Sequence, residues 1–253
     1  MTPAGSRRPF VLAADNHFTS LALEQQAWLR RRYRRGPDTE AAVLLAVSAL
    51  TPATVLEVGA GAGALASMIR RHIDVRTMAV DSNATLVADA HARGLDAVVA
   101  DVRALPFADA SLECVVADRT LRRRRDVDRG LAEISRVLRG AGALVVVARS
   151  NTCDGHELDV LTGYDPRART DALSAAMAWD VLRRHFHRVD QLTLDYTLEF
   201  PDGQAAARYV ATLPGRATQV SRIAGVDRPI RLSYGARLFV AEAPRRPVSR
   251  RVT

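Results

Sequence analysis

Length, composition and charge limit what this chain can be. With 253 residues, 48% of them hydrophobic, it can bury a full core as one domain or as one domain with an appendage. The formal net charge of +8 would suit an acidic partner, but all 36 basic residues are arginine. Six of these lie in acid-free terminal segments, namely Arg7, Arg8, Arg245, Arg246, Arg250 and Arg251. The body of the chain is therefore nearly neutral, and composition gives little support for nucleic-acid binding.

Cysteine content and hydropathy bear on metal binding and on where in the cell the protein is located. Cys114 and Cys153 form neither a disulfide framework nor a metal-ligand cluster, so no metal site is expected. No run approaches the roughly 20 apolar residues that span a bilayer. The stretch SRRPFVL at 6–12 suggests a twin-arginine export signal, but the polar residues at 15–17 interrupt it. We expect a cytoplasmic protein without membrane contact.

Signals for strands and helices alternate through the first two thirds of the chain. Apolar runs typical of parallel strands covered on both faces stand at 53–58, 76–81, 96–101, 112–118 and 143–148. The intervening segments carry apolar residues at amphipathic-helix spacing. These are Leu65, Met68 and Ile69, then Leu86, Val87 and Ala90 before Gly94, then Leu131, Ile134 and Leu138 up to Gly140. The pattern predicts a doubly wound parallel α/β sheet.

The last third changes character. Residues 171–186 are predicted as a helix, and residues 191–200 alternate strictly between apolar and polar. We expect an antiparallel strand there, paired with 232–243 through a turn at 201–203 and an irregular stretch. The apolar face would be Leu192, Leu194, Tyr196, Leu198 and Phe200.

A glycine-rich turn carries the most informative chemistry. In VLEVGAGAGALA, residues 55–66, Gly59, Gly61 and Gly63 lie between the first strand and the first helix, where a ligand can approach the backbone. The same spacing also fits a dinucleotide site, since Asp81 follows about 20 residues later, where a ribose-binding acid belongs. The glycines alone do not choose the cofactor.

The positions of two acidic residues favour one of these cofactors. Glu57 precedes the first glycine, and its carboxylate would attract a cationic ammonium but repel a pyrophosphate. A further acid, Asp101, ends the third strand. With these features the sequence resembles the class I S-adenosylmethionine-dependent methyltransferases, in the branch with E/D-x-G-x-G-x-G. The resemblance covers residues 53–149 well, through VLEVGAGAG, AVDSN, ADVRALPFADASLECVVADRTL and LAEISRVLRGAGALVVVA, and the final hairpin loosely.

The resemblance implies a fold. It is an α/β, Rossmann-like, doubly wound and mostly parallel seven-stranded sheet with an antiparallel C-terminal hairpin. Residues 1–50 would form an N-terminal helical lid segment and 51–150 the adenosylmethionine-binding core. Residues 151–243 would supply a substrate-side helix and the hairpin of the same domain, and 244–253 a disordered basic tail.

The resemblance also implies residue roles. Asp81 would accept hydrogen bonds from the ribose hydroxyls and Asp101 from the adenine amino group, with Val102 against the ring. Asp118 would face the methyl-transfer region. A lone aspartate at a strand end is more often a helix cap or a solvated loop residue, but three on successive strands are hard to obtain by accident. The implied cofactor residues are Glu57, Gly59, Gly61, Gly63, Asp81, Ser82, Asp101, Val102, Asp118 and Leu121.

Methyl transfer by in-line displacement needs little more than positioning, with a base where the acceptor carries a proton. His156, just beyond the fifth strand, and His17, in the lid segment, are the candidate bases. In the run at 118–130, Arg122 and Arg123 are predicted at the pocket rim, where they would contact an anionic or polar acceptor; an exposed turn is the alternative. Asp126 is the expected cap of the following helix.

Three functions remain open. The first, which we favour, is a methyltransferase acting on an O or N atom of a small-molecule acceptor, as a monomer or homodimer. The second is an RNA methyltransferase, suggested by the basic ends and by WLRRRYRR at 28–35, although a solvated helix face is the favoured interpretation of that run. The third is an adenosylmethionine-binding protein without catalysis, since no general base is evident.

Overall fold

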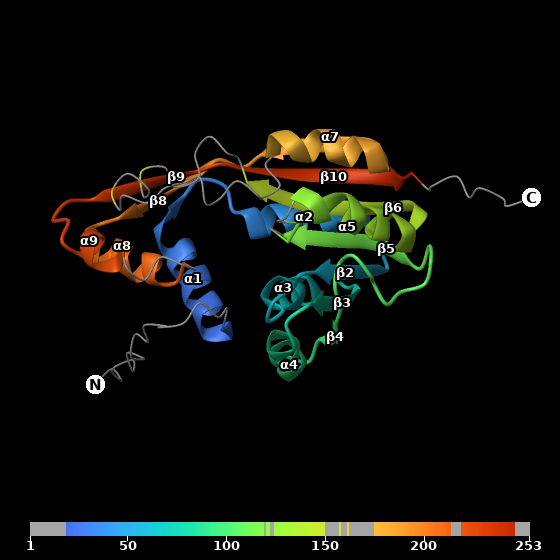
Figure 1. Cartoon of the computed structure of the whole chain (residues 1–253), viewed down its shortest axis with the longest axis horizontal. Helices are drawn as coiled ribbons and strands as arrows, with labels where there is room; N and C mark the ends of the chain where they lie inside the picture. The colour runs from blue at the N-terminus through green and yellow to red at the C-terminus, as the bar shows by residue number, and fades with distance from the viewer. Residues whose placement is uncertain are drawn as a thin grey trace, which may run out of the picture. The chain divides into compact units, whose positions relative to one another are not determined.

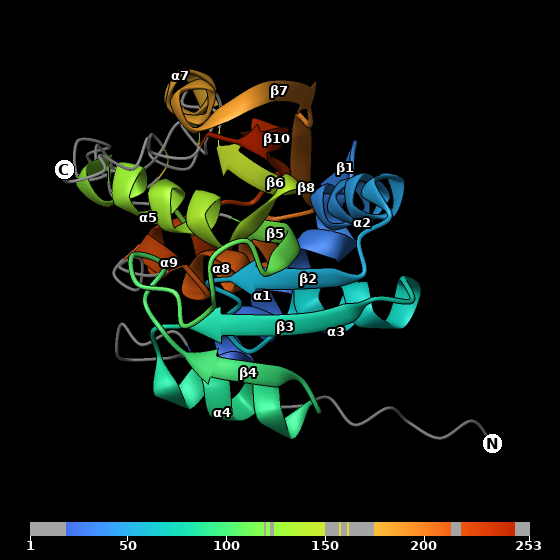
Figure 2. The same cartoon turned by 90° about the vertical axis from the view of Figure 1, so that its right-hand side faces the viewer.

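Seven strands form the larger of two sheets in the computed structural model (Figures 1 and 2). The structure describes residues 19–118, 120, 121, 124–149, 157, 161, 175–213 and 219–245. The strands pair in parallel from β4 to β6, whereas β10 is antiparallel to both of its neighbours. In spatial order they are β4 (Asp96–Val99), β3 (Arg76–Asp81), β2 (Thr54–Val58), β5 (Leu112–Asp118), β6 (Leu138–Arg149), β10 (Ala236–Pro244) and β7 (Phe186–Thr193). The predicted fold class is confirmed.

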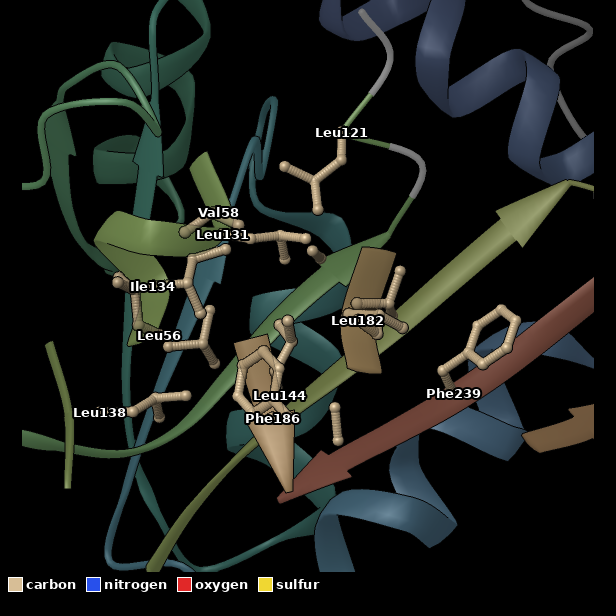
Figure 3. Packing of buried hydrophobic residues seen from close by; sticks show 14 of the residues in the cluster. Leu56, Val58, Leu121, Leu131, Ile134, Leu138, Leu144, Leu182, Phe186 and Phe239 are labelled. Carbon is tan, nitrogen blue, oxygen red and sulfur yellow. The ribbon is translucent and has the colours of Figure 1, made fainter. Parts of the chain in front are cut away.

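Helices cover both faces of this sheet, as a doubly wound fold requires. On one face lie α5 (Arg124–Val137) and α7 (Ala175–His185), and on the other α2 (Thr39–Leu50), α3 (Ala64–His72) and α4 (Ala84–Ala92) (Figure 2). Neighbouring strand residues divide between the faces: Leu56 packs with α5, and Val55 packs with α2 and α3. Figure 3 shows Leu131 and Leu182 in the core on the α5 side.

Polar caps fix where several helices begin. Asn83 accepts hydrogen bonds from the amides of Thr85 and Leu86 at the start of α4, and Asp38 does the same for Glu40 and Ala41 at the start of α2. Both caps satisfy helix amides that have no partner within the helix. Residues 39–50, placed by the sequence in a lid segment, pack on the sheet through α2.

The chain forms two compact units. The larger contains the seven-stranded sheet and its helices, and the smaller contains α1 (Ser20–Tyr33), α8 (Gly203–Ala211) and α9 (Val220–Ala224). Within the smaller unit the Phe200 ring lies 4.8 Å from Tyr33 and 5.6 Å from Tyr209, centroid to centroid. A second sheet of three strands has the order β1 (Arg34–Arg35), β8 (Tyr196–Phe200), β9 (Ile230–Tyr234).

The predicted strand at 191–200 is wrong in extent. The chain leaves the large sheet after Thr193, and residues from Tyr196 onward form β8 in the small sheet. The predicted buried face also fails at Leu192, which is 54% exposed. Leu192 lies on the edge strand β7, opposite Leu238 of β10. Leu238 is buried in the core beneath α2 and α3, but that core does not extend to Leu192.

Three other boundaries differ from the prediction. The stretch after 203, expected to be irregular, contains α8 and α9, with Asp202 capping α8 through the amide of Ala205. Helix α5 ends at Val137 rather than at Gly140, because Leu138 already pairs with Leu112 in the sheet. Because α5 begins at Arg124, Asp126 lies in its first turn rather than at its cap.

At the C-terminal end, β10 reaches Pro244, one residue into the segment predicted as a tail. No helix in the described part of the chain is long and apolar enough to cross a membrane.

Candidate functional site

Acidic side chains gather at one edge of the large sheet. Asp81 and Asp118 are the last residues of β3 and β5, Glu57 is the next-to-last residue of β2, and Asp101 follows two residues after β4. These four strands are neighbours in the order β4-β3-β2-β5 and run parallel, so their carboxyl ends lie side by side. Open parallel sheets bind their ligands at this edge.

The glycine turn between β2 and α3 has a backbone that requires glycine. Gly59, Gly61 and Gly63 have φ values of 66°, 57° and 75°, in the left-handed region that other residues adopt only with strain. A Cβ at Gly59 would stand 2.3 Å from side-chain atoms of Thr120, and one at Gly63 would stand 2.2 Å from Leu95. The turn is therefore both conformationally special and closely packed.

Glu57 has a structural role that the sequence did not suggest. Its side chain is buried in the sheet, with the residue 4% exposed, and its Oε2 accepts a hydrogen bond of 2.7 Å from the amide of Ala66. Ala66 lies in the first turn of α3, whose cap residue, Gly63, has no side chain to supply this bond. The Glu57 carboxylate thus lies at the positive end of α3, a favourable place for a buried anion.

Asp81 ties the glycine turn to the end of β3. Its Oδ2 accepts from the amide of Gly61 at 2.8 Å and its Oδ1 from the amide of Asn83 at 2.9 Å. Each carboxylate oxygen has a second lone pair for a further donor, such as a hydroxyl. Ser82 is exposed between these groups.

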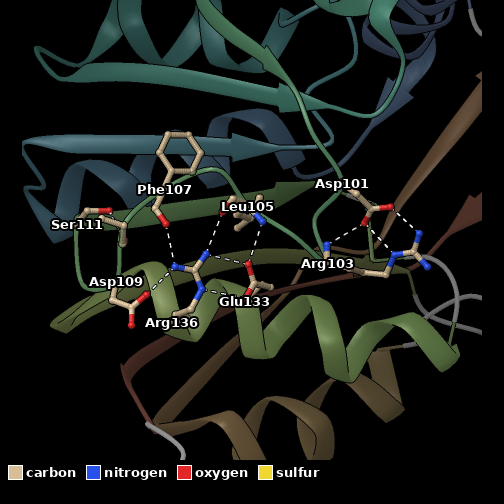
Figure 4. A network of polar contacts seen from close by, with 9 residues as sticks. Asp101, Arg103, Leu105, Phe107, Asp109, Ser111, Glu133 and Arg136 are labelled. Carbon is tan, nitrogen blue, oxygen red and sulfur yellow. Dashed lines mark hydrogen bonds and ion pairs between the residues drawn. The ribbon is translucent and has the colours of Figure 1, made fainter.

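Asp101 is held by its own loop. Its Oδ1 accepts from the amide of Arg103 at 2.8 Å and from Nε at 2.9 Å, and its Oδ2 accepts from Nη2 at 2.6 Å (Figure 4). These bonds to Arg103 hold the pKa of Asp101 below its usual range, so the group is an anion at neutral pH.

Two apolar residues of the predicted site meet on α5. A Cβ at Gly130 would lie 3.2 Å from Leu121 and 3.4 Å from Val102, so the absence of a side chain there lets both residues approach the helix. Leu121 is buried, and Val102 is half-buried beside Asp101.

Sequence reasoning missed Thr120. Its Oγ1 donates a hydrogen bond of 2.9 Å to the carbonyl of Val58, and its side chain lies against Gly59, so it joins the segment after β5 to the glycine turn. No periodicity marks it; its place two residues after a strand-ending acid is the only signal. The predicted residues His17, Arg122, Arg123 and His156 lie outside the described residues.

Comparison with known proteins identifies the segment that builds this edge. Residues 56–146, which contain the glycine turn and the acids from Glu57 to Asp118, match the methyltransferase domain family. The match to this family covers these residues and not the rest of the chain. The resemblance inferred from the motifs is thereby confirmed.

Curated relatives of the methyltransferase domain match part of their own length. The demethylmenaquinone methyltransferase of Thermobifida fusca is 33% identical over 124 residues, 46% of this chain and 50% of that protein. The malonyl-[acyl-carrier protein] O-methyltransferase of Herminiimonas arsenicoxydans is 31% identical over 159 residues, 61% of this chain and 60% of that protein. The chain thus spans about half the length of the curated relatives it matches.

A solved structure shares the fold over a wider range. The YcgJ protein of Bacillus subtilis superposes with a TM-score of 0.58 at 16% identity, covering 82% of this chain and 98% of that one. At this identity the likeness concerns the fold alone.

Proposed function

We propose that this protein is an S-adenosylmethionine-dependent methyltransferase that transfers the methyl group to an O or N atom of a small molecule. The observation that carries the proposal is the line of carboxylates on adjacent strands beside a glycine turn, within a methyltransferase domain. A nicotinamide dinucleotide would bring a pyrophosphate toward Glu57, whereas the methionine part of adenosylmethionine brings an ammonium.

The described residues fit this cofactor part by part. The Asp81 carboxylate, fixed by the amides of Gly61 and Asn83, would accept from the ribose hydroxyls. The Asp101 anion would accept from the adenine amino group, and Val102 would lie against the ring. The glycine turn gives the methionine portion access to the backbone, and Asp118 and Leu121 would border the transferred methyl group.

Catalysis would rest on positioning. Adenosylmethionine, when bound, supplies a methyl group on a sulfonium that is already a good leaving group. The protein would then hold the acceptor atom in line with that methyl group and exclude water, which supplies much of the acceleration. A base would take the proton of a protonated acceptor, and His156 and His17 remain the candidates from the sequence.

Two observations support a small-molecule acceptor. The relatives named above are called demethylmenaquinone and malonyl-[acyl-carrier protein] methyltransferases, neither a nucleic-acid enzyme by name. Moreover, several described arginines are paired with acids in the structure, which reduces the charge they could offer to phosphates. Such pairs are Arg34–Asp38, Arg76–Asp96, Arg139–Glu113, Arg188–Glu242 and Arg237–Asp195.

Calorimetric titration with S-adenosylhomocysteine tests the cofactor. The wild-type chain should bind it with one site, and Asp81→Ala should weaken binding at least tenfold, about 1.4 kcal/mol. Asp96→Ala is the matched control, because Asp96 begins β4 at the opposite edge and pairs only with exposed Arg76 among the contacts described. Unchanged affinity in Asp81→Ala would refute the assigned site.

Transfer of labelled methyl groups tests the acceptor. With wild-type enzyme and fractionated extract, label should enter the small-molecule fraction and should not depend steeply on salt. Label in RNA, falling steeply with salt, would establish the RNA alternative instead. Cofactor binding without turnover in any fraction would establish a non-catalytic binding protein.

A further inference from the structure

We propose that Glu133 and Arg136 of α5 are positioning residues for the adenine end of the cofactor: they hold the loop between β4 and β5 so that Asp101 meets the adenine amino group. The inference rests on the proposed function, because it concerns the same cofactor. Neither residue was singled out by the sequence, and neither stands at the carboxyl edge of the sheet where the acids gather.

Arg136 binds the loop through most of its guanidinium donors. Nη1 donates to the carbonyl of Phe107 at 2.8 Å and to the carboxylate of Asp109 at 2.7 Å, and Nη2 donates to the carbonyl of Leu105 at 2.9 Å (Figure 4). A single side chain on a regular helix thus fixes three alternate residues of the loop. Because loop carbonyls accept these bonds, they hold the path of the main chain and not merely a side chain.

Glu133 completes the arrangement from the previous turn of the helix. Its two oxygens accept from Nε and Nη2 of Arg136, both at 2.9 Å, and Oε2 also accepts from the amide of Leu105 at 2.9 Å. The main chain of Leu105 is therefore held on both sides, its amide by Glu133 and its carbonyl by Arg136. The Arg136 guanidinium also holds the pKa of Glu133 below its usual range.

The same side of α5 reaches the predicted adenine residues directly. Gly130 precedes Glu133 by three positions, as Glu133 precedes Arg136, and residues at this spacing follow one another along one side of a helix. At Gly130 the helix meets Val102. One helix side therefore contacts the loop at Val102, Leu105, Phe107 and Asp109, which fixes its path from next to Asp101 onward.

This anchoring has a consequence for binding. Asp101 lies outside the regular strand. The Ala100 amide before it donates to the carbonyl of Asp81, whereas the Asp101 carboxylate is held by Arg103 in the loop that follows. A loop that must be ordered by the ligand reduces affinity, whereas a loop ordered beforehand does not. The effect should be specific: releasing the loop should reduce mainly the contact that Asp101 makes, which is the one to the adenine amino group.

The test compares two ligands that differ at that group and at the neighbouring ring nitrogen N1, which carries a hydrogen only in the 6-oxo ligand. S-Adenosylhomocysteine presents the 6-amino group of adenine, and S-inosylhomocysteine presents a 6-oxo group, which would face the Asp101 carboxylate as an acceptor facing an acceptor. Wild-type protein should prefer the first at least tenfold. Arg136→Lys and Glu133→Gln should lower this preference several-fold by weakening the first ligand, and should add little to Asp101→Asn in a double-mutant cycle.

Asp128→Asn is the matched control. Asp128 is on the same helix, but its carboxylate contacts Arg184 and His185 of α7, at 3.0 and 3.2 Å, rather than the loop. This variant should lose stability without losing the ligand preference. Amide exchange at Leu105 should accelerate in Glu133→Gln and not in Asp128→Asn, even where Arg136→Lys folds poorly.

The outcomes separate this inference from the proposed function. Retention of the full preference by Glu133→Gln and Arg136→Lys would overturn the positioning role, and so would full additivity with Asp101→Asn. Failure of the wild-type protein to bind either ligand would overturn the proposed function and, with it, this inference.

Discussion

Substituting Gly59 by alanine should damage the protein in a way that can be worked out from the structure. Gly59 has a φ of 66°, and an added Cβ would lie 2.3 Å from both Cγ2 and Oγ1 of Thr120 and 2.8 Å from its Cβ. Real side chains do not approach so closely, so Thr120 would have to move. Its hydrogen bond to the carbonyl of Val58 would then be lost.

The expected cost has two parts. A left-handed backbone costs a residue other than glycine about 1–2 kcal/mol. Loss of the Thr120 hydrogen bond adds about 1 kcal/mol. The free energy of unfolding should therefore fall by roughly 2–3 kcal/mol. In a chain of this size each kcal/mol lowers Tm by about 2–4 °C, which gives a decrease of roughly 4–12 °C.

Thermal and urea unfolding by circular dichroism would measure this change. Gly140→Ala is the control, because nothing lies within 4 Å of its added Cβ and it stands in β6, where alanine should be neutral or slightly stabilising. Adding Thr120→Gly to Gly59→Ala should relieve the clash without restoring the Thr120 hydrogen bond, so the backbone cost and the cost of the lost bond should both remain. A loss below about 1 kcal/mol in Gly59→Ala, or one equal to that of Gly140→Ala, would refute the reasoning.

Three further results are expected. Arg103→Gln should let the pKa of Asp101 rise, because Arg103 holds that pKa low. The decrease in adenosylhomocysteine affinity on acidification should then begin at a higher pH than in the wild type. Titration calorimetry from pH 3.5 to 7 would measure this, and an unshifted profile would show that the pair is unimportant. Asn83→Ala should remove the cap of α4 and cost about 1 kcal/mol in urea unfolding, whereas an unchanged midpoint would contradict the cap. Adenosylhomocysteine at 100 times its Kd should stabilise the folded protein by about 2.7 kcal/mol and raise Tm in differential scanning fluorimetry, and no rise would contradict binding to the native state.

The sequence predicted the central sheet well because its signals are local and redundant. Each parallel strand is an apolar run covered on both faces, and a glycine turn or an amphipathic helix separates it from the next. The position of Asp81 followed from the end of such a run. The same logic placed Asp101, although its strand ends two residues earlier than predicted.

The sequence pattern predicted the wrong structure where the same pattern is compatible with two different structures. Alternation over 191–200 continues smoothly across Leu194 and Asp195, where the chain passes between sheets, and periodicity carries no mark of that change. The stretch PDG at 201–203 predicts a turn, yet the same Asp202 serves as a helix cap, and the alanine-rich residues after it favour a helix.

Contacts between residues far apart in the sequence could not be predicted either. The bond from Ala66 to Glu57 joins residues on two elements, and the sequence suggested for Glu57 only a ligand partner. Thr120 gave no pattern at all, since its importance comes from the space above Gly59. Such roles depend on how elements meet, which a single sequence does not record.

All basic residues of the chain are arginine, and at Arg136 the structure shows what an arginine does that a lysine could not. Its guanidinium makes bonds to Glu133, Asp109 and the carbonyls of Leu105 and Phe107, and the planar fork supplies them from three nitrogens at once. A lysine has one nitrogen with three hydrogens and could not reach these acceptors together. The excess of arginine that first suggested a nucleic-acid partner thus serves, at this position, to hold a loop of the protein itself.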